Sequence, residues 1–359
     1  MKKPFLLFDW YLIVPIIFLV LISLNILFSI NPLFLRNQLF ALSVSFVAFF
    51  IFSQIAYTDF RSFSLPLYIS AVVLLIVVYI LGFESRGAVR WLDIFGVSLQ
   101  ASEIAKPILT LAFAGFLAGR SGNSFKLLLT TLFFLLPVFV LIYLQPDLGN
   151  ALVFVIVLVL SLLVFGVPIK WFVIGSLPFI VSAPSIWYRI HDYQRMRILT
   201  FFNPLRDPDG SSYNLIQAII AVGSGGVFGK GITEGTQSRL NFLPENHTDF
   251  IFASLAEKLG FVGSLFVVLL FVFIFFRIYQ IFSRTKDIYG QMIVSCAFFF
   301  LLVQFFVNIG MNLGLVPIVG LTLPFVSYGG SSLLACFILV GILSSVSTRN
   351  RENSLIEIK

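Results

Sequence analysis

The residues best suited to chemistry include a glutamate and a lysine three positions apart beside apolar sequence. Glu103 and Lys106 share one face of a predicted helix, because positions i and i+3 are neighbours on a helix surface. Ser102 precedes them and is of the type that caps a helix N-terminus, so we expect the helix to start there. The pair predicts either a structural ion pair or a site in which Lys106 meets an anionic group and Glu103 orients it.

Two aspartates follow proline turns between apolar runs. Asp147 comes directly after a proline, where it either caps the next helix or faces a polar cavity. Asp249 follows the turn at Pro244, and we expect the next helix to begin at Thr248 and Asp249. Asp249 is then either a cap stabilised by the helix dipole or a general base. His247 beside it is more typical of a hydrogen-bonding partner than of a catalyst.

One long polar interval holds cations that could bind a diphosphate. Arg195 and Arg197 lie in it, and its glycine-rich stretch, residues 223–231, contains Lys230. The stretch matches neither a Walker A motif nor the dinucleotide-binding pattern. Backbone N–H groups of glycines beside Lys and Arg can still cradle a diphosphate, and the alternative is a flexible turn.

A last polar segment, residues 320–332, interrupts apolar sequence with Pro, Gly and Ser, including Ser327. Irregular backbone at membrane depth requires surrounding protein or a water-filled cavity. Upstream, Asn308 and Asn312 flank Gly310 on one helix face, where small residues for helix packing are the simpler interpretation.

The composition requires a membrane to surround these segments. Apolar residues make up 59% of the 359 residues, charged residues 11%, and the mean hydropathy is +1.04. A soluble domain carries about a quarter charged residues, so this chain cannot cover its surface in water. The net charge of +7 then reports orientation and contact with anionic groups rather than nucleic-acid binding.

Apolar runs of spanning length predict an all-α polytopic protein with ten transmembrane helices. The predicted spans are 10–29, 38–57, 65–82, 103–119, 126–143, 150–166, 171–185, 249–276, 288–312 and 326–346.

The basic residues predict that both termini are cytoplasmic. Twelve Lys and Arg residues then fall on the inner side, whereas the short outer loops hold only Arg36, Arg86 and Arg90. We expect one transmembrane domain over residues 1–359, with a long extracytoplasmic loop at about 187–248. Because the polar motifs gather on the outer side, a site for a charged substrate is expected there.

Eight short motifs follow one another along the chain, and their order is informative. They are Arg36 with Gln38, Gly87–Trp91, Glu103 with Lys106, Gln145–Gly149, Arg195 with Arg197, Ser224–Gly226, Pro244–Phe250 and Pro324–Ser332. Together they resemble the SEDS family (shape, elongation, division and sporulation), which includes RodA, FtsW and SpoVE. Val89, Ala101 and Lys258 depart from the family's pattern. The opening Phe8–Trp10 and the overall length are similar to a RodA-like member.

The resemblance implies a peptidoglycan glycosyltransferase of the cytoplasmic membrane. Such an enzyme polymerises lipid II on the outer face, for cell elongation and rod shape. It works with a monofunctional class B penicillin-binding protein, a transpeptidase, within the elongation machinery. Asp249 matches the family's catalytic carboxylate. The expected substrate-binding residues are Glu103, Lys106, Asp147, Arg195, Arg197, Lys230, Arg36, Arg90, His247 and Ser327.

The chemistry of this reaction fits the residue types. It needs a base for the acceptor sugar hydroxyl and positive charge for the departing diphosphate. A divalent cation could assist, but no ligand set for one stands out in the sequence. Two alternatives stay open: a lipid II flippase, because ten helices with broken segments also suit alternating access, and a non-catalytic cell-wall scaffold.

Overall fold

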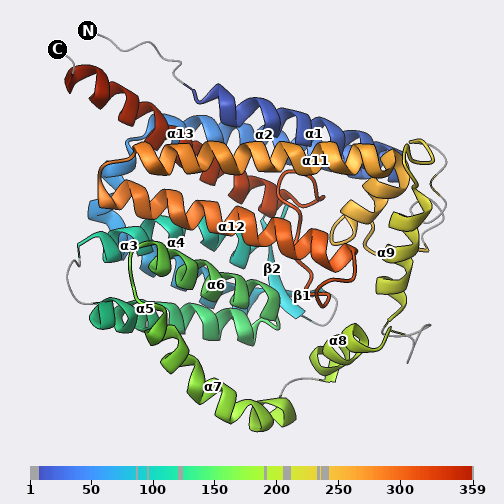
Figure 1. Ribbon diagram of the computed structural model, residues 1–359, viewed down its shortest axis with the longest axis horizontal. Helices are drawn as coiled ribbons and strands as arrows, with labels where there is room; N and C mark the ends of the chain where they lie inside the picture. The colour runs from blue at the N-terminus through green and yellow to red at the C-terminus, as the bar shows by residue number, and fades with distance from the viewer. Residues whose placement is uncertain are drawn as a thin grey trace.

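A computed structural model describes residues 8–85, 88–94, 97–119, 124–189, 192–204, 212–232, 235 and 242–357 (Figure 1). The elements are α1 (Trp10–Ile30), α2 (Pro32–Gln54), η1 (Tyr57–Phe63), α3 (Ser64–Leu81), β1 (Phe83–Ser85), β2 (Ala88–Ile94), β3 (Val97–Gln100), α4 (Ala101–Ala118), α5 (Ser124–Leu144), α6 (Leu148–Val164), α7 (Ile169–Arg189), α8 (Asp192–Phe202), α9 (Tyr213–Ser224), α11 (Ile251–Arg284), α12 (Ile288–Asn312) and α13 (Gly330–Glu357). Helix α1 begins and α13 ends at one end of the bundle, and α9 lies at the other end (Figure 1).

The prediction of a polytopic helical membrane protein is confirmed. Within the described residues, eight helices are long and apolar enough to cross a membrane: α1, α2, η1 with α3, α4, α5, α11, α12 and α13. Helices satisfy their backbone hydrogen bonds internally, which lipid requires. The other two predicted spans coincide with α6, an apolar helix of 17 residues, and with α7. The total of ten spans therefore stays a prediction.

The predicted start of the second span, at residue 38 of 38–57, is later than the start of the helix in the structure. Helix α2 begins at Pro32, because the Asn31 side chain accepts a hydrogen bond from the Leu33 N–H at 2.9 Å. Hydropathy misses this turn because polar residues at 36–38 follow it. The extra helical turns place the start of α2 beside the candidate site.

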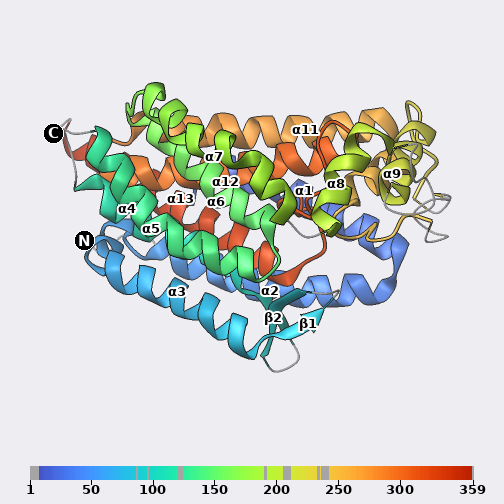
Figure 2. The ribbon, with the colours of Figure 1, turned by 90° about the horizontal axis from the view of Figure 1, so that it is seen from below.

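The polar interval before α4 forms a small antiparallel sheet that the sequence analysis does not predict. Strand β2 pairs with β1 and β3, and its Trp91 lies opposite Gln100 of β3. Figure 2 shows the sheet beyond the end of α3. Strands β1 and β3 have only three and four residues, too few for an alternating pattern to stand out. Because β3 runs directly into α4, the sheet fixes the start of the helix that carries Glu103.

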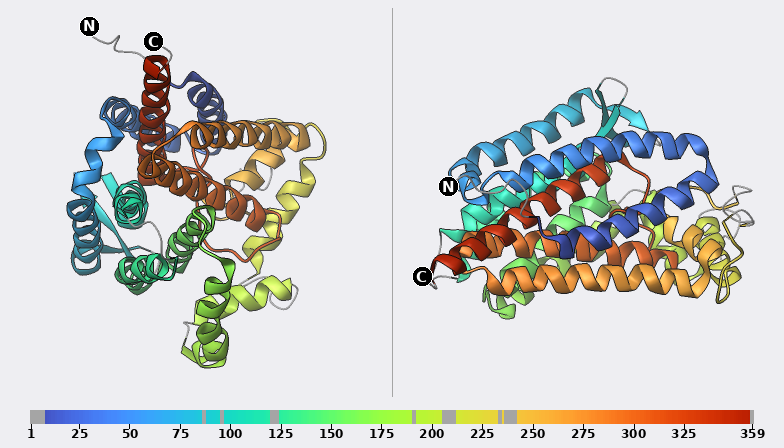
Figure 3. Two further views of the ribbon diagram at one scale, coloured as in Figure 1. Left: turned by 60° about the vertical axis from the view of Figure 1, so that its left-hand side comes forward. Right: turned by 90° about the horizontal axis from the view of Figure 1, so that it is seen from above.

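The centre of the bundle is formed by α4, α12 and α13, which are buried over most of their length, whereas α2 and α3 expose most of theirs. Helix α13 packs closely along α2: a Cβ on Gly341 would lie 2.9 Å from the carbonyl oxygen of Phe49. Small residues allow this approach between membrane helices. Helices α7 and α8 stand away from the others, in green in the left view of Figure 3.

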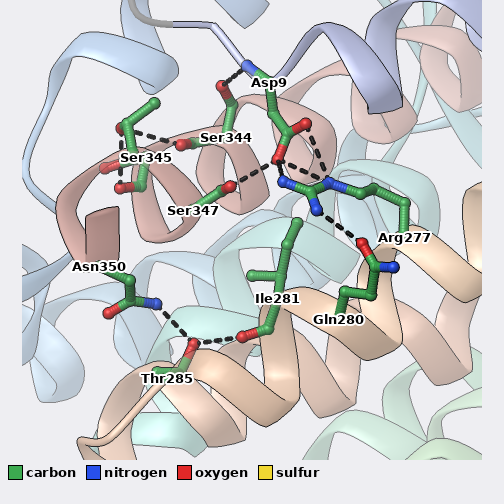
Figure 4. Close-up of polar contacts among 10 residues, drawn as sticks. Asp9, Arg277, Gln280, Ile281, Thr285, Ser344, Ser345, Ser347 and Asn350 are labelled. Carbon is green, nitrogen blue, oxygen red and sulfur yellow. Dashed lines mark hydrogen bonds and ion pairs between the residues drawn. The ribbon is translucent and has the colours of Figure 1, made fainter. Parts of the chain in front are cut away.

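A buried ion pair joins three helices at the end of the bundle where the chain begins and ends (Figure 4). Arg277 of α11 donates to Asp9 through Nη2 at 2.6 Å and through Nε at 3.0 Å. Ser347 of α13 donates to the same carboxylate at 2.5 Å. A buried ion pair is tolerated when its remaining polar atoms are satisfied in this way. Asp9 lies just before α1, so the contacts tie α1 to α11 and α13.

Candidate active site

Asp249 is presented by a tight turn rather than by a helix. Residues 244–250 form consecutive turns, and α11 begins only after Phe250, so the expected start at Thr248 is too early. The Glu245 carbonyl accepts from the N–H groups of Thr248 and Phe250, each at 3.1 Å, and its carboxylate accepts from Thr248 Oγ1 at 3.0 Å. Glu245 has φ 55°, an uncommon left-handed conformation. Backbone held in this way often marks a functional site.

Asp249 is partly exposed, and its backbone carbonyl is firmly held. Its carbonyl oxygen accepts hydrogen bonds from the side-chain amides of Asn308 and Asn312, each at 3.0 Å. Its Oδ2 lies 3.4 Å from the place of a Cβ on Gly320, which has φ 72°. The carboxylate therefore lies against backbone that bears no side chain. A general base needs this combination of accessibility and fixed position.

Ser327 joins the turn of Asp249 to the irregular segment before α13. Its Oγ donates to the Thr248 carbonyl at 2.7 Å and accepts from the Leu323 N–H at 2.8 Å. Its own carbonyl accepts from the Gln38 side chain at 3.3 Å. The side chain is buried. Ser327 thus holds two segments in register, and its contact with substrate stays a prediction.

His247 lies between aromatic rings at the start of α2. It stacks on Phe34 with ring centroids 4.2 Å apart, and Tyr328 lies 5.4 Å away. The Tyr328 N–H also donates to the His247 carbonyl at 2.8 Å. Arg36 is exposed on the same first turns of α2, where Asn37 donates to the Tyr328 hydroxyl at 3.3 Å. The structure therefore brings Arg36 and His247 to the Asp249 side of the bundle.

Asp147 caps α6, which is the first of the two roles predicted for it. It precedes the first residue of the helix, and its Oδ1 accepts from the Asn150 N–H at 3.3 Å. Its buried carboxylate also accepts from Gln100 Nε2 at 2.8 Å and from Ser102 Oγ at 3.1 Å, and Arg90 lies 3.7 Å away. Ser102 is consequently not an N-cap, because α4 begins one residue earlier and the hydroxyl is turned to Asp147.

Glu103 and Lys106 form the predicted ion pair, with Nζ and Oε1 2.5 Å apart. Both are buried, at 3% and 1% exposure. The second oxygen, Glu103 Oε2, is buried and makes no hydrogen bond to any described residue. Cys336 of α13 lies close enough to interact electrostatically with both charges. The pair lies in the buried core of the bundle on α4.

The irregular segment 319–329 and the first turn of α13 connect these groups. On one side Gly320 faces the Asp249 carboxylate, and a Cβ on Gly149 would lie 2.6 Å from the preceding carbonyl, that of Val319. On the other side Ser331 Oγ accepts from the Gln100 N–H at 2.9 Å, at the start of α4. The predicted residues on α4, on α6 and before α11 thus surround one segment of backbone.

The glycine-rich stretch lies elsewhere, against a break in α11 at Gly260 (φ 67°). The N–H groups of Lys230 and Gly231 donate to carbonyls of α11 at 3.0 and 3.1 Å. A Cβ on Gly225 or Gly229 would lie 2.0 or 2.2 Å from α11 carbonyl oxygens. These glycines are therefore required for close packing of two backbones, which accounts for the stretch without a bound phosphate.

The three cations predicted to bind a diphosphate lie on two elements, Arg195 and Arg197 on α8 and Lys230 in the glycine-rich stretch. Lys230 Nζ is 3.7 Å from the buried Glu257 of α11. Arg195 of α8 donates to the Trp187 carbonyl at 2.9 Å and lies 5.6 Å from that ring. Arg197 is exposed on the same helix. Their contact with substrate stays a prediction.

Sequence reasoning missed the partners of the two aspartates. Asn308 and Asn312 are predicted as packing residues, yet they bind the Asp249 carbonyl, and Gln100 binds Asp147. The i, i+4 spacing of two amides in an apolar helix was the available indication. Among the described residues, no group of three or more His, Cys, Asp and Glu side chains could hold a metal ion. Arg86 of the predicted outer loops and Gly87 of the second motif lie outside the described residues.

Comparison with known proteins agrees with this arrangement. The cell cycle protein family of FtsW, RodA and SpoVE matches residues 3–352. Peptidoglycan glycosyltransferase MrdB of Escherichia coli K12 is 38% identical over 317 residues, covering 86% of this chain and 84% of the relative. Stage V sporulation protein E of Bacillus subtilis is 35% identical over 320 residues, covering 86% and 85%.

Solved structures show the same fold. A chain from a study entitled "Structural coordination of polymerization and crosslinking by a peptidoglycan synthase complex" matches with TM-score 0.84 and 29% identity, over 96% of this chain and 99% of that one. The rod shape determining protein RodA of Thermus thermophilus matches with TM-score 0.74 and 28% identity, over 96% and 98%. The chain belongs to the FtsW, RodA and SpoVE family.

Proposed function

We propose that the protein polymerises lipid II into glycan strands at the outer face of the cytoplasmic membrane, with Asp249 as general base. The observation that carries the proposal is the partly exposed residue Asp249, whose backbone is held by Asn308 and Asn312. The relatives named peptidoglycan glycosyltransferases support the enzyme class. The protein is accordingly a glycosyltransferase, and its similarity to MrdB and RodA favours a role in elongation.

The reaction needs one proton transfer and one displacement. Asp249 accepts the proton of the acceptor sugar hydroxyl while that oxygen attacks the anomeric carbon of the donor sugar. The bond from this carbon to the diphosphate oxygen breaks, and the lipid diphosphate leaves. Arg90, whose side chain is 28% exposed, and Lys106 are the cations that we propose for that leaving group.

The partner that we propose is a class B penicillin-binding protein, whose transpeptidase domain crosslinks the strands. The match to a chain from a complex that coordinates polymerisation with crosslinking supports it. Co-purification from membranes at endogenous levels checks this, and recovery of the protein alone would count against it.

The decisive variant for the base is Asp249→Asn. It keeps the shape of the side chain and loses basicity, so we expect folded protein that binds lipid II and makes no polymer. Losing a positioned base typically costs about 10²–10⁴-fold in rate. The measurement is polymer formation by purified protein with lipid II, alongside the thermal melting temperature.

Three outcomes contradict the proposal in different ways. Polymer formation by Asp249→Asn at more than about a tenth of the normal rate rules out Asp249 as the general base. Translocation of lipid II in vesicles without polymer indicates a flippase. A protein that neither polymerises nor translocates, but supports growth with Asp249→Asn, indicates a scaffold.

A further inference from the structure

Two asparagines at the end of α12 have a more specific role than helix packing. Asn308 and Asn312 are one turn apart on the same face, and both are fully buried at 0% exposure. A buried amide is costly unless its hydrogen bonds are made. Their partners therefore indicate why the helix carries them.

Both side chains converge on the Asp249 backbone. Asn308 Nδ2 donates to the Asp249 carbonyl at 3.0 Å and to the Leu321 carbonyl at 2.7 Å. Asn312 Nδ2 donates to the same Asp249 carbonyl at 3.0 Å, and its Oδ1 accepts from the Ala253 N–H at 2.9 Å. The Asp249 carbonyl thus accepts two amide hydrogen bonds, and Asn312 contacts backbone on both sides of the start of α11.

These hydrogen bonds fix the backbone on two sides of the Asp249 carboxylate, at Asp249 itself and at Leu321. The peptide plane that follows Asp249 is held by two donors, so its Cα cannot shift without breaking them. Leu321, held by Asn308, comes directly after Gly320, whose Cβ position lies 3.4 Å from Asp249 Oδ2. A displacement of about 1 Å at a reacting group can cost about a hundredfold in rate.

We propose that Asn308 and Asn312 are positioning residues for the Asp249 carboxylate. The proposal rests on the proposed function, because it concerns the same carboxylate. It assigns the pair to the rate of the chemical step and not to the binding of lipid II, since neither side chain is accessible to substrate.

The test uses Asn308→Ala and Asn312→Ala in the purified full chain, with initial polymerisation rates measured over a range of lipid II concentrations. We expect kcat to fall about ten- to a hundredfold while KM changes less than about threefold. If an alanine variant does not yield folded protein, the serine variant at the same position, Asn308→Ser or Asn312→Ser, keeps a hydrogen-bond donor and replaces it. Its kcat should be below that of the native protein with KM changed less than about threefold, and a native kcat would overturn the proposal.

Gln304→Ala is the matched control. Gln304 lies one turn before Asn308 in α12, is nearly as buried at 1% exposure, and its Nε2 makes no hydrogen bond to any described residue. Its loss should leave kcat near the native value. An equal fall in kcat for Gln304→Ala would show general loosening of α12 and would overturn the proposal.

A double-mutant cycle separates this proposal from the proposed function. In an Asp249→Asn background, Asn312→Ala should reduce the residual rate by less than about twofold, because residues that act through one group are not additive. If Asn312→Ala lowers the rate in this background as much as it does in the native protein, Asn312 has another role and the proposal is overturned. If Asp249→Asn is inactive while both alanine variants keep native kcat, only the positioning role fails. If Asp249→Asn is active, the proposed function fails and the positioning role with it.

Discussion

Glu103 and Lys106 carry a charge pair into the core of the bundle, where charges are costly. At 3% and 1% exposure the two side chains have lost nearly all contact with solvent. Removing two ions from water commonly costs as much as their attraction returns, so a buried pair is weak evidence for stability alone. The unbonded Glu103 Oε2 adds to that cost. Ionisable residues inside a membrane protein therefore call for a functional explanation.

A double neutral substitution separates the structural pair from the site. Glu103→Gln with Lys106→Met keeps the shapes and removes both charges, so stability should stay close to normal. If Lys106 stabilises a departing diphosphate, polymerisation should fall at least about a hundredfold. Polymerisation by purified protein and the melting temperature are the two measurements.

The matched control is Lys258→Met, because Lys258 is equally buried, at 1% exposure, and donates to Ser29 at the end of α1. It should leave polymerisation close to normal. A double variant that polymerises at the native rate would leave Glu103 and Lys106 with a structural role only.

At this scale the sequence predicts which residues are chemically unusual better than it predicts what they contact. The i, i+3 spacing of Glu103 and Lys106 is local, so the ion pair could be predicted from helix geometry alone. Asn312 binds a carbonyl 63 positions away, and Asp147 binds Gln100 at 47 positions. Those partners are set by the packing of whole helices, which no local pattern encodes.

Among the elements, the break in α11 shows what the glycine-rich stretch does. Gly260 interrupts the helix with φ 67°, and the N–H groups of Phe261 and Val262 just beyond it donate to the Gly226 and Val227 carbonyls at 2.9 and 3.1 Å. The stretch after α9 is thereby fastened to α11 by backbone bonds in both directions. Its close packing on α11 follows from these backbone contacts, and diphosphate binding by the stretch stays a prediction.

Two glycine substitutions should act in opposite directions. Gly229→Ala places a Cβ 2.2 Å from the Lys258 carbonyl at φ 81°, so it should destabilise by more than about 1–3 kcal/mol. Gly223→Ala lies in α9 with no atom within 4 Å of its Cβ, and should stabilise by up to about 1 kcal/mol, because alanine favours helix. Melting temperatures of both variants check this. An unchanged melting temperature for Gly229→Ala together with a raised KM for lipid II would instead support the prediction that the stretch binds a diphosphate.

The elements differ in how far the sequence predicts them. Apolar runs such as those of α12 and α13 coincide with helices because a spanning helix is defined by length and hydropathy. The sheet is missed because its strands are short, and the start of α2 because its first turns are polar. The irregular segment before α13 is predicted as irregular, yet its role as the connection between α4 and Asp249 depends on its neighbours.

Across the whole molecule, α11 indicates where the membrane lies. Residues 259–276 contain no charge and would span about 27 Å as a helix, close to the hydrocarbon thickness of about 30 Å. Lys258 precedes this run and Arg277 follows it. Asp249 therefore lies beyond the membrane core at one end, and the Asp9–Arg277 ion pair lies at the other, near both ends of the chain (Figures 1 and 4).

The last prediction concerns which of these ends faces outward. The excess of Lys and Arg in the termini and the loops of the Arg277 end predicts that this end is cytoplasmic. Ser98 in β3 and Ser283 near the end of α11 are both exposed, and replacing each by cysteine changes one atom. In intact cells an impermeant maleimide should label Ser98→Cys, and Ser283→Cys only after permeabilisation. The native Cys296 and Cys336 are buried and contribute little background. Labelling of Ser283→Cys alone in intact cells would place Asp249 on the cytoplasmic side, where polymerisation on the outer face is impossible.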